Sequence, residues 1–408
     1  MNNKWLIVIV AVLAVSVLVT AGVVVSLSMA RDDEQADAAP ADEQADGQEA
    51  AVTEAEQAVD LAASEQAAND ALTGPRLAFI SDQEGGGPVY VMNADGSNRQ
   101  RISEPGLRTC LYPTWSPDEQ RVVYWGTEEG TFKGDGIDAG VWVSAADGAE
   151  HVRVDRDVAD VLTLPPPIWS PDGTRVVFVA GNDADDGSTI HIAWANGNGI
   201  EQSIALPWEI QSLAWSPVVD DLLFVSKTAL PDRGSAYVWS SRTEEITEIF
   251  AGTEAADWSP DGDEFVVGDV AGKSVSIVKP GQEPRPVIPV ARGVPLVVAW
   301  SPDGTRVAIG IGPGDRRGTC FPIYPPTSLY VVTLESGEVA TIAEHQGRIQ
   351  HANWTSDGSR LLYTFVDLGA RPGGYYPWAN LWSYDATSGQ LMQVTDEEGF
   401  AGLGDWSH

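Results

Sequence analysis

The sequence contains few residues of the types that build disulfide networks and metal sites. Of 408 residues, 2 are cysteine, 5 are histidine, 4 are methionine and 5 are lysine. Two cysteines cannot form a disulfide framework, and no two histidines have the spacing of a His-Glu-x-x-His metal pair. We therefore expect stability to come from an apolar core, for which 15 tryptophans and an apolar content of 43% are available.

Positive charge is also scarce. Lysine and arginine together number 24 against 59 acidic residues, which gives a net charge of −35. A chain this acidic repels phosphates, so nucleic acid is not an expected partner. Residues 31–73 hold 13 of the acids with one base and no aromatic residue, and such a composition does not form a core. We predict an acidic stalk over residues 29–73, disordered or partly helical, and a separate body over residues 74–408.

An uncharged, strongly apolar run extends from Trp5 to Leu27. About 23 helical residues are enough to cross a bilayer. A lone cation at Lys4 and acids beyond the run favour a cytoplasmic stub at residues 1–4 and an exported body. A cleaved signal peptide is the alternative, but the run is longer than a signal h-region. We predict a transmembrane signal anchor over residues 5–28 that contacts the lipid bilayer, and a body at the cell membrane outside the cytoplasm.

A short marker, Trp-Ser-Pro-Asp-Gly or a variant of it, recurs along the body. Successive marker tryptophans are 54, 46, 43, 42, 54 and 52 residues apart, which is the period of a four-stranded propeller blade. A strand-like run follows each marker, then a second run that ends in a turn, then a third run that leads to the next marker. The marker tryptophans are Trp115, Trp169, Trp215, Trp258, Trp300, Trp354 and Trp406.

The marker has the chemistry of a tight turn that follows a packed tryptophan. Proline presets φ, aspartate bonds the local backbone and glycine takes the left-handed position, while the large flat tryptophan suits the wedge between blades. The run at residues 76–80 has no marker before it, and Trp406-Ser407 has no run after it. Joining the two ends completes one blade, so we predict an all-β fold: a seven-bladed β-propeller of four-stranded antiparallel blades.

The runs at residues 77–81, 89–98 and 101–103 resemble the repeats of TolB-like, WD40-related propellers. The resemblance covers about 330 residues and implies the fold more than the function. Such repeats serve as protein-binding platforms, as specificity domains of prolyl oligopeptidase-like enzymes and in some polysaccharide lyases. The chain departs from TolB because an anchor and stalk replace its amino-terminal α/β domain, so a TolB role in outer-membrane maintenance is not carried over.

The sequence shows no catalytic constellation. A peptidase of this kind needs a hydrolase domain with a Gly-x-Ser-x-Gly elbow, and the chain reaches His408 without room for one. We therefore expect binding without catalysis, and no cofactor. The segment at residues 182–187 resembles the opening of a calcium loop but lacks the downstream bidentate glutamate. Its weak metal candidates are Asp183, Asp185 and Asp186.

Export would expose both cysteines to oxidising conditions. We place Cys110 in the link that enters the second blade and Cys320 in a loop of the sixth blade, on the same face. Because these blades are not neighbours, a disulfide requires the loop at residues 312–327 to fold across the face. A Cys110–Cys320 disulfide and two free buried thiols both stay open.

The face that carries Cys320 also has the longest loops, which we expect at residues 127–139, 181–188, 312–327 and 367–379. The last two combine aromatic residues with arginine, the composition of a binding hot spot on a rigid support. The alternative is that these aromatics only cap the blade ends. The candidate partner-binding residues are Phe321, Tyr324, Arg371, Tyr375, Tyr376 and Trp378.

Three functions follow from this organisation. The first is a membrane-anchored, extracytoplasmic scaffold that recognises a protein or a cell-envelope polymer through its long-loop face. The second is a polysaccharide-acting enzyme, a lyase or hydrolase, with catalytic groups near the central axis. The third is a structural subunit of an envelope complex. Carboxylates, histidine and arginine converging on the axis would favour an enzyme.

Overall fold

The regular elements in the described part of the body are all β-strands. A computed structural model describes the chain in ranges that begin after the predicted anchor and stalk, and no helix in these ranges is long and apolar enough to cross a bilayer. The predicted anchor at 5–28 and stalk at 29–73 lie outside the described residues. The described ranges are 75–81, 87–133, 136–156, 158, 165–181, 187–227, 234–312, 327–345, 347–367, 378–395 and 401–406.

Five of the sheets in these ranges have four antiparallel strands each. The first sheet contains β1 (Arg76–Ser81), β2 (Val89–Asn93), β3 (Gln100–Arg101) and β27 (Ala401–Trp406). The second contains β4 (Leu107–Trp115), β5 (Arg121–Lys133), β6 (Gly136–Ala145) and β7 (His151–Arg153). The third contains β8 (Ile168–Trp169), β9 (Arg175–Gly181), β10 (Ser188–Trp194) and β11 (Ile200–Leu206).

The fourth and fifth of these sheets lie toward the end of the chain, after a longer sheet. One contains β19 (Val294–Trp300), β20 (Arg306–Gly312), β21 (Thr327–Thr333) and β22 (Val339–His345). The other contains β23 (Arg348–Trp354), β24 (Arg360–Asp367), β25 (Trp378–Asp385) and β26 (Leu391–Gln393). In each of the two, consecutive strands are neighbours, as expected for hairpins joined in series.

The longer sheet has seven strands because one strand belongs to two repeats. It contains β12 (Glu209–Trp215), β13 (Leu222–Lys227), β14 (Gly234–Trp239), β15 (Ile246–Trp258), β16 (Phe265–Asp269), β17 (Ser274–Val278) and β18 (Arg285–Pro289). The first part of β15 pairs with β14 and its last part pairs with β16. The two parts meet at Thr253, which is opposite Gly234 of β14 and Asp269 of β16, and Gly252 before it has a φ of 84°. A single strand thus connects two repeats without a break.

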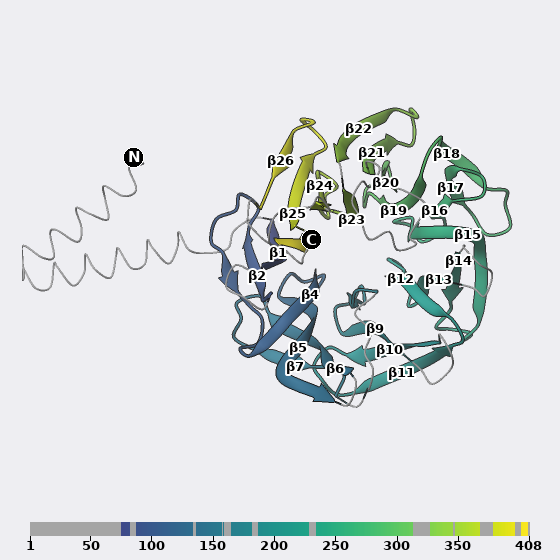
Figure 1. The fold of residues 1–408 in the computed structure, drawn as a ribbon. Helices are drawn as coiled ribbons and strands as arrows, with labels where there is room; N and C mark the ends of the chain where they lie inside the picture. The colour runs from purple at the N-terminus through teal and green to yellow at the C-terminus, as the bar shows by residue number, and fades with distance from the viewer. Residues whose placement is uncertain are drawn as a thin grey trace, which may run out of the picture. The chain divides into compact units, whose positions relative to one another are not determined.

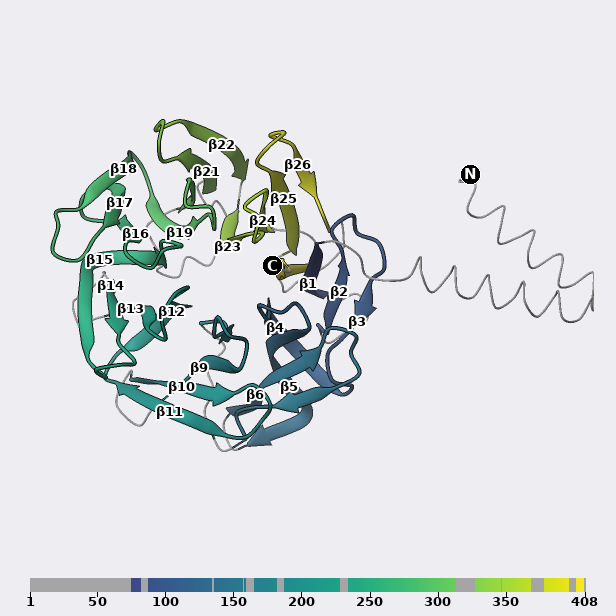
Figure 2. The same cartoon turned by 180° about the vertical axis from the view of Figure 1, so that it is seen from behind.

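The sheets are arranged in a ring (Figure 1), and the view from behind shows the same order (Figure 2). Inner strands contact one another in the sequence β4, β8, β12, β15, β19, β23, β27 and back to β4. The ring closes where β27 pairs antiparallel with β1, with Leu77 opposite Trp406. The last strand of the chain therefore completes the first sheet. A closed ring of antiparallel sheets is a β-propeller.

The marker tryptophans fill the spaces between successive sheets. Six of them are between 1% and 9% exposed. Trp115 packs on Ala78 and Val91 of the preceding sheet, and Trp354 packs on Ala299 and Leu329. The predicted packing between blades is confirmed for these residues, while the side chain of Trp406 lies outside the described residues. The six are Trp115, Trp169, Trp215, Trp258, Trp300 and Trp354.

One predicted loop is a hairpin. Residues 127–139 were expected to be one of the long loops, but β5 and β6 continue as a paired extension in which Thr127 is opposite Ala139 and Phe132 is opposite Ile137. The threonine, phenylalanine and isoleucine residues of this segment favour extended pairing.

The marker turns share one hydrogen-bond pattern. In the turn after Trp300, the Ser301 hydroxyl donates to Asp303 at 2.6 Å and accepts the Arg306 N–H at 2.9 Å. Although burial opposes it, hydrogen bonds from Ser301, Thr305 and Arg306 lower the pKa of Asp303 to about 2. Gly304 has a φ of 72°, as the left-handed turn position requires. The carboxylate is therefore ionised at any physiological pH.

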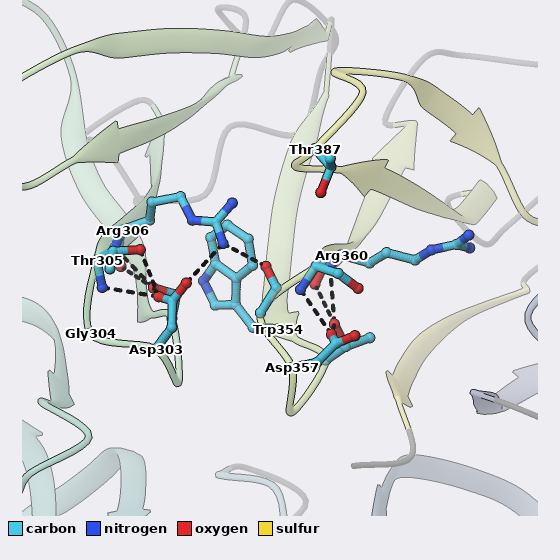
Figure 3. Close-up of polar contacts among 12 residues, drawn as sticks. Asp303, Gly304, Thr305, Arg306, Trp354, Asp357, Arg360 and Thr387 are labelled. Carbon is cyan, nitrogen blue, oxygen red and sulfur yellow. Dashed lines mark hydrogen bonds and ion pairs between the residues drawn. The ribbon is translucent and has the colours of Figure 1, made fainter.

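An arginine six residues after a marker tryptophan connects its sheet to the next one. Figure 3 shows the Arg306 side chain over the Trp354 ring, between the turns of Asp303 and Asp357. The guanidinium carbon is 5.1 Å from the ring centroid, and Nη2 donates to the Gly358 carbonyl at 2.8 Å. We call this contact the arginine latch. It recurs where Arg76 covers Trp115 and where Arg121 covers Trp169.

We expect Arg306→Ala to lower the free energy of unfolding by about 2 kcal/mol, because the variant loses a cation–π contact and leaves the Gly358 carbonyl without its charged donor. Urea unfolding followed by tryptophan fluorescence measures the change. Arg285→Ala is the control, since that guanidinium is 58% exposed and 3.9 Å from Glu264. A loss no larger than that of the control would show that the latch does not stabilise the ring.

Candidate functional site

The predicted partner-binding loops fall almost entirely outside the described residues, and so does the weak metal candidate. For Trp378, only the backbone is described, at the start of β25. The long-loop face therefore stays a prediction. In the described part of the chain, no group of three or more histidine, cysteine, aspartate or glutamate side chains could hold a metal ion. The predicted residues outside the described ranges are Phe321, Tyr324, Arg371, Tyr375, Tyr376, Asp183, Asp185 and Asp186.

The two cysteines are not placed as a pair. Cys110 lies within strand β4 and not in a link before it, because the inner strand begins earlier than the marker spacing indicated. Cys320 lies outside the described residues. Their pairing stays a prediction.

Polar side chains gather on the inner strands where the ring closes. The Asp405 Oδ2 atom accepts the backbone N–H of Trp115 at 2.9 Å, and the Asp405 carbonyl accepts the Trp115 indole N–H at 3.2 Å. The amide Nδ2 of Asn353 donates to the other carboxylate oxygen. Asp405 is 6% exposed, so this carboxylate joins β23, β27 and β4 in the interior. Tyr112 lies on the same inner strand as Trp115, and Arg348 and His351 lie on the same inner strand as Asn353, and we call these residues together with Asp405 the closure cluster.

Tyr112 has an unusual backbone in the closure cluster. Its φ is 52°, and it lies in a stretch of β4 where the register with β5 shifts. A tyrosine in the left-handed region is strained, and such strain persists where surrounding structure enforces it. Burial raises the pKa of the Tyr112 phenol, and the positive charge of Arg348 opposes that rise.

His351 and Asn353 add hydrogen-bond acceptors to this group. Burial lowers the pKa of His351 to about 4, so the imidazole is neutral at pH 7. The Asn353 Oδ1 atom is buried and has no hydrogen-bond partner in the described structure. A phenol and a guanidinium donate hydrogen bonds, whereas a neutral imidazole and an amide oxygen accept them. The cluster thus presents donors and acceptors of the kind that peptide groups require.

One set of residues elsewhere has the distances of a serine–histidine–acid triad. Ser144 Oγ is 2.8 Å from His151 Nδ1, and His151 Nε2 is 3.8 Å from Glu104 Oε2. Ser144 is fully buried, and its hydroxyl also contacts the Tyr124 hydroxyl at 2.8 Å. A hydroxyl in this position cannot reach a substrate carbonyl, and the imidazole presents the opposite nitrogen from a serine protease. These residues connect β5, β6 and β7 and have a structural role.

A second inner carboxylate, Asp257, joins β15 to β19. It accepts the backbone N–H groups of Trp258 and Trp300, each at 2.9 Å. Burial raises the pKa of Asp257 to about 6, against the opposing effect of these two hydrogen bonds. At this position along the ring the arginine latch is missing, because Glu264 stands six residues after Trp258, where four of the other described repeats have arginine. The Asp257 carboxylate therefore joins inner strands β15 and β19 by hydrogen bonds to the backbone, at a boundary between repeats where the arginine latch is missing.

No family model matches the chain. An uncharacterized peptidase of Bacillus subtilis (strain 168), YuxL, is 26% identical over 237 residues, which is 54% of this chain and 33% of the relative. The chain therefore matches about a third of the length of that relative. The relative is named a peptidase, and this overturns our expectation that the chain acts without catalysis. That expectation depended on a missing hydrolase motif and gave no weight to similarity within the repeats.

Solved structures define the fold. The β-propeller domain of the Trilobed protease from Pyrococcus furiosus has 15% identity and a TM-score of 0.54, covering 80% of this chain and 96% of that chain. A prolyl endopeptidase has 13% identity and a TM-score of 0.56, covering 79% and 49%. TolB from Acinetobacter baumannii has 13% identity and a TM-score of 0.46, covering 81% and 66%. The predicted resemblance to TolB and related β-propellers is confirmed, and at these identities it concerns the fold alone.

Proposed function

We propose that this chain is a propeller that binds polypeptides in a peptidase-type activity. The similarity to a peptidase of Bacillus subtilis is the observation that carries the proposal. Its propeller has seven blades in this proposal, because the seven-stranded sheet counts as two blades that share β15. The amino-terminal anchor and acidic stalk hold it at the cell membrane outside the cytoplasm, and the long-loop face contributes to recognition.

The closure cluster supports the choice of a polypeptide. A peptide group offers one N–H donor and one carbonyl acceptor, and the cluster offers both complements within one small region. Asn353 has a buried oxygen without a partner among the described residues, and a buried unsatisfied acceptor costs about 1–3 kcal/mol. His351 and Arg348 of β23 and Asp405 of β27 lie on neighbouring inner strands, and residues of these types are the ones that the enzyme hypothesis calls for.

The charge of the body limits which polypeptides it accepts. Residues 74–408 carry a net charge of −24, after subtracting −12 for residues 31–73 and +1 for Lys4 from the total of −35. Such a field repels anionic chains and attracts cationic ones over about 10 Å at moderate salt. We therefore expect neutral or basic peptides to be preferred over acidic ones.

Incubation of the full-length chain with a mixed peptide library tests the proposal, with mass spectrometry of the retained and cleaved peptides. We expect neutral or basic peptides to be retained or cut, and Tyr112→Phe with His351→Gln to reduce retention by about tenfold, or 1.4 kcal/mol. His191→Gln is the matched control. His191 forms a hydrogen bond with Ser203 in the sheet of β8 to β11, which contains no residue of the closure cluster. Peptides neither retained nor cut by the natural chain would refute the proposal, and retention of envelope polymer would favour the polysaccharide hypothesis.

A further inference from the structure

The third marker breaks the repeat pattern in an exposed place. It is Trp215-Ser216-Pro217-Val218-Val219-Asp220, with two valines where the marker has Asp-Gly. Val218 is 57% exposed and Val219 is 43% exposed, and no other exposed large apolar residue of the described structure exceeds Val218. We call residues 216–221 the valine turn. At the Val218 position the other described markers have Asp118, Asp172, Asp261, Asp303 and Asp357.

The valines weaken the turn that contains them. In an ordinary marker the aspartate accepts the serine hydroxyl, as Asp261 does from Ser259 at 2.6 Å. In the valine turn, the Ser216 hydroxyl accepts only the N–H groups of Val218 and Val219, both at 3.4 Å. The chain thus gives up local hydrogen bonds and exposes apolar surface. Replacing the Asp-Gly of the marker by two valines does not stabilise the turn, and such departures from local sequence preference are expected at functional sites.

The fold of the valine turn does not depend on these side chains. Arg175 lies over the Trp215 ring at 5.2 Å and contacts Asp220 Oδ1 at 2.7 Å. These two contacts fix both sides of the turn from the preceding sheet. The valine side chains are therefore available to a partner while the backbone is held in place.

The surroundings of the valines are acidic. Val218 contacts the next marker turn at Gly262, because a Cβ placed there would collide with the Val218 side chain. Asp261 and Asp263 flank this glycine. The Asp263 side chain is 68% exposed, and its Oδ2 atom is 3.4 Å from Nζ of Lys279, an exposed surface pair. Hydrogen bonds from Ser259 and the backbone hold the pKa of Asp261 below its usual range, so Asp261 is ionised. An apolar pair thus lies beside an ionised Asp261, and a ligand cation would compete with Lys279 for Asp263.

We propose that the valine turn, with Asp261 and Asp263, is a docking surface for a protein segment in which an apolar side chain is flanked by arginine or lysine. The apolar side chain covers Val218 and Val219, and the cations pair with the carboxylates. A second copy of this chain is a poor occupant, because its body has the same negative charge. The surface consists of the turn between β12 and β13 and the turn between β15 and β16, and it shares no residue with the closure cluster.

The test uses a variant that restores the repeat. Val218→Asp with Val219→Gly recreates Trp-Ser-Pro-Asp-Gly, so we expect it to fold at least as stably as the natural chain. The probe is a fluorescein-labelled hexapeptide of alternating arginine and leucine, titrated with full-length chain and followed by anisotropy. We expect the double variant to bind this peptide at least about tenfold more weakly.

Matched peptides and variants distinguish docking at the valine turn from the non-specific electrostatic attraction of cationic peptides to the acidic chain. Hexapeptides of alternating arginine and serine, or glutamate and leucine, should bind the natural chain about tenfold more weakly than the arginine–leucine peptide. Leu391→Ser with Met392→Ser, which removes exposed apolar residues on β26, should leave binding unchanged. Equal binding of the arginine–leucine peptide by the natural chain and the restored variant would overturn the proposal, and so would equally tight binding of the arginine–serine peptide.

Discussion

Replacement of Asp405 by alanine is expected to lower the free energy of unfolding by about 3 kcal/mol. The variant leaves the buried backbone N–H of Trp115 without its acceptor and removes the partner of the Asn353 amide. A buried donor left unsatisfied costs about 1–3 kcal/mol, and more when its lost partner was charged. The effect should be large because β27 is the strand that closes the ring.

Urea unfolding at pH 7, followed by tryptophan fluorescence, measures this loss. Asp405→Asn keeps the side-chain shape and one oxygen acceptor, so it should lose about half as much as the alanine variant. Asp385→Ala is the control, since Asp385 accepts only local N–H groups from Thr387 and Ser388 in an exposed turn. If Asp405→Ala and Asp385→Ala lose the same amount, the carboxylate does not hold the ring closed.

His351 and Asp257 are expected to make stability depend on pH in opposite directions. The pKa of His351 is lowered to about 4 in the folded chain. The unfolded chain therefore takes up a proton first as pH falls below about 6.5, and stability is lost toward pH 4. The pKa of Asp257 is raised to about 6. There the folded chain takes up a proton first, and stability is gained as pH falls from 6 toward 4.

The contributions of His351 and Asp257 to the pH dependence of stability oppose each other in the natural chain, so single variants should reveal each one. Between pH 7 and pH 4.5, His351→Gln should gain about 2 kcal/mol in unfolding free energy relative to the natural chain, and Asp257→Asn should lose about 2 kcal/mol. The double variant should follow the natural chain closely. Urea unfolding at the two pH values measures these differences. Parallel pH profiles for all four proteins would contradict the shifted pKa values of both residues.

The repeat architecture was predictable because its signals are local. The turn after Trp300 is built from Ser301, Asp303 and Gly304, and each acts on backbone within a few residues. Turn chemistry of this kind depends on the residues themselves and not on distant contacts. The unmatched marker at Trp406 predicted the pairing of the last strand with the first, which follows from the need to cover open edges.

The closure cluster was not predictable in the same way. Asp405 and Trp115 are 290 positions apart, and neither Tyr112 nor Asn353 belongs to a motif. The arginine latch was also missed, although its signal was present as an arginine six residues after most marker tryptophans. Its partner lies in the next repeat, so its role depends on how two sheets stack. The departure at Val218 was visible in the sequence, but only the structure shows that its side chain is exposed.

The strand order, the marker turns and the burial of the tryptophans follow from the amino-acid sequence, because they depend on local conformational preference and on the apolar pattern. The tertiary structure alone decided which polar groups meet: Asp405 with Trp115 and Asn353, and Val218 with the turn of Gly262. Ring closure brings residues together that no local preference connects. Hydrogen bonds and charge pairing act over a few ångströms in space, so their partners follow from the packing of the sheets and not from the order of the chain.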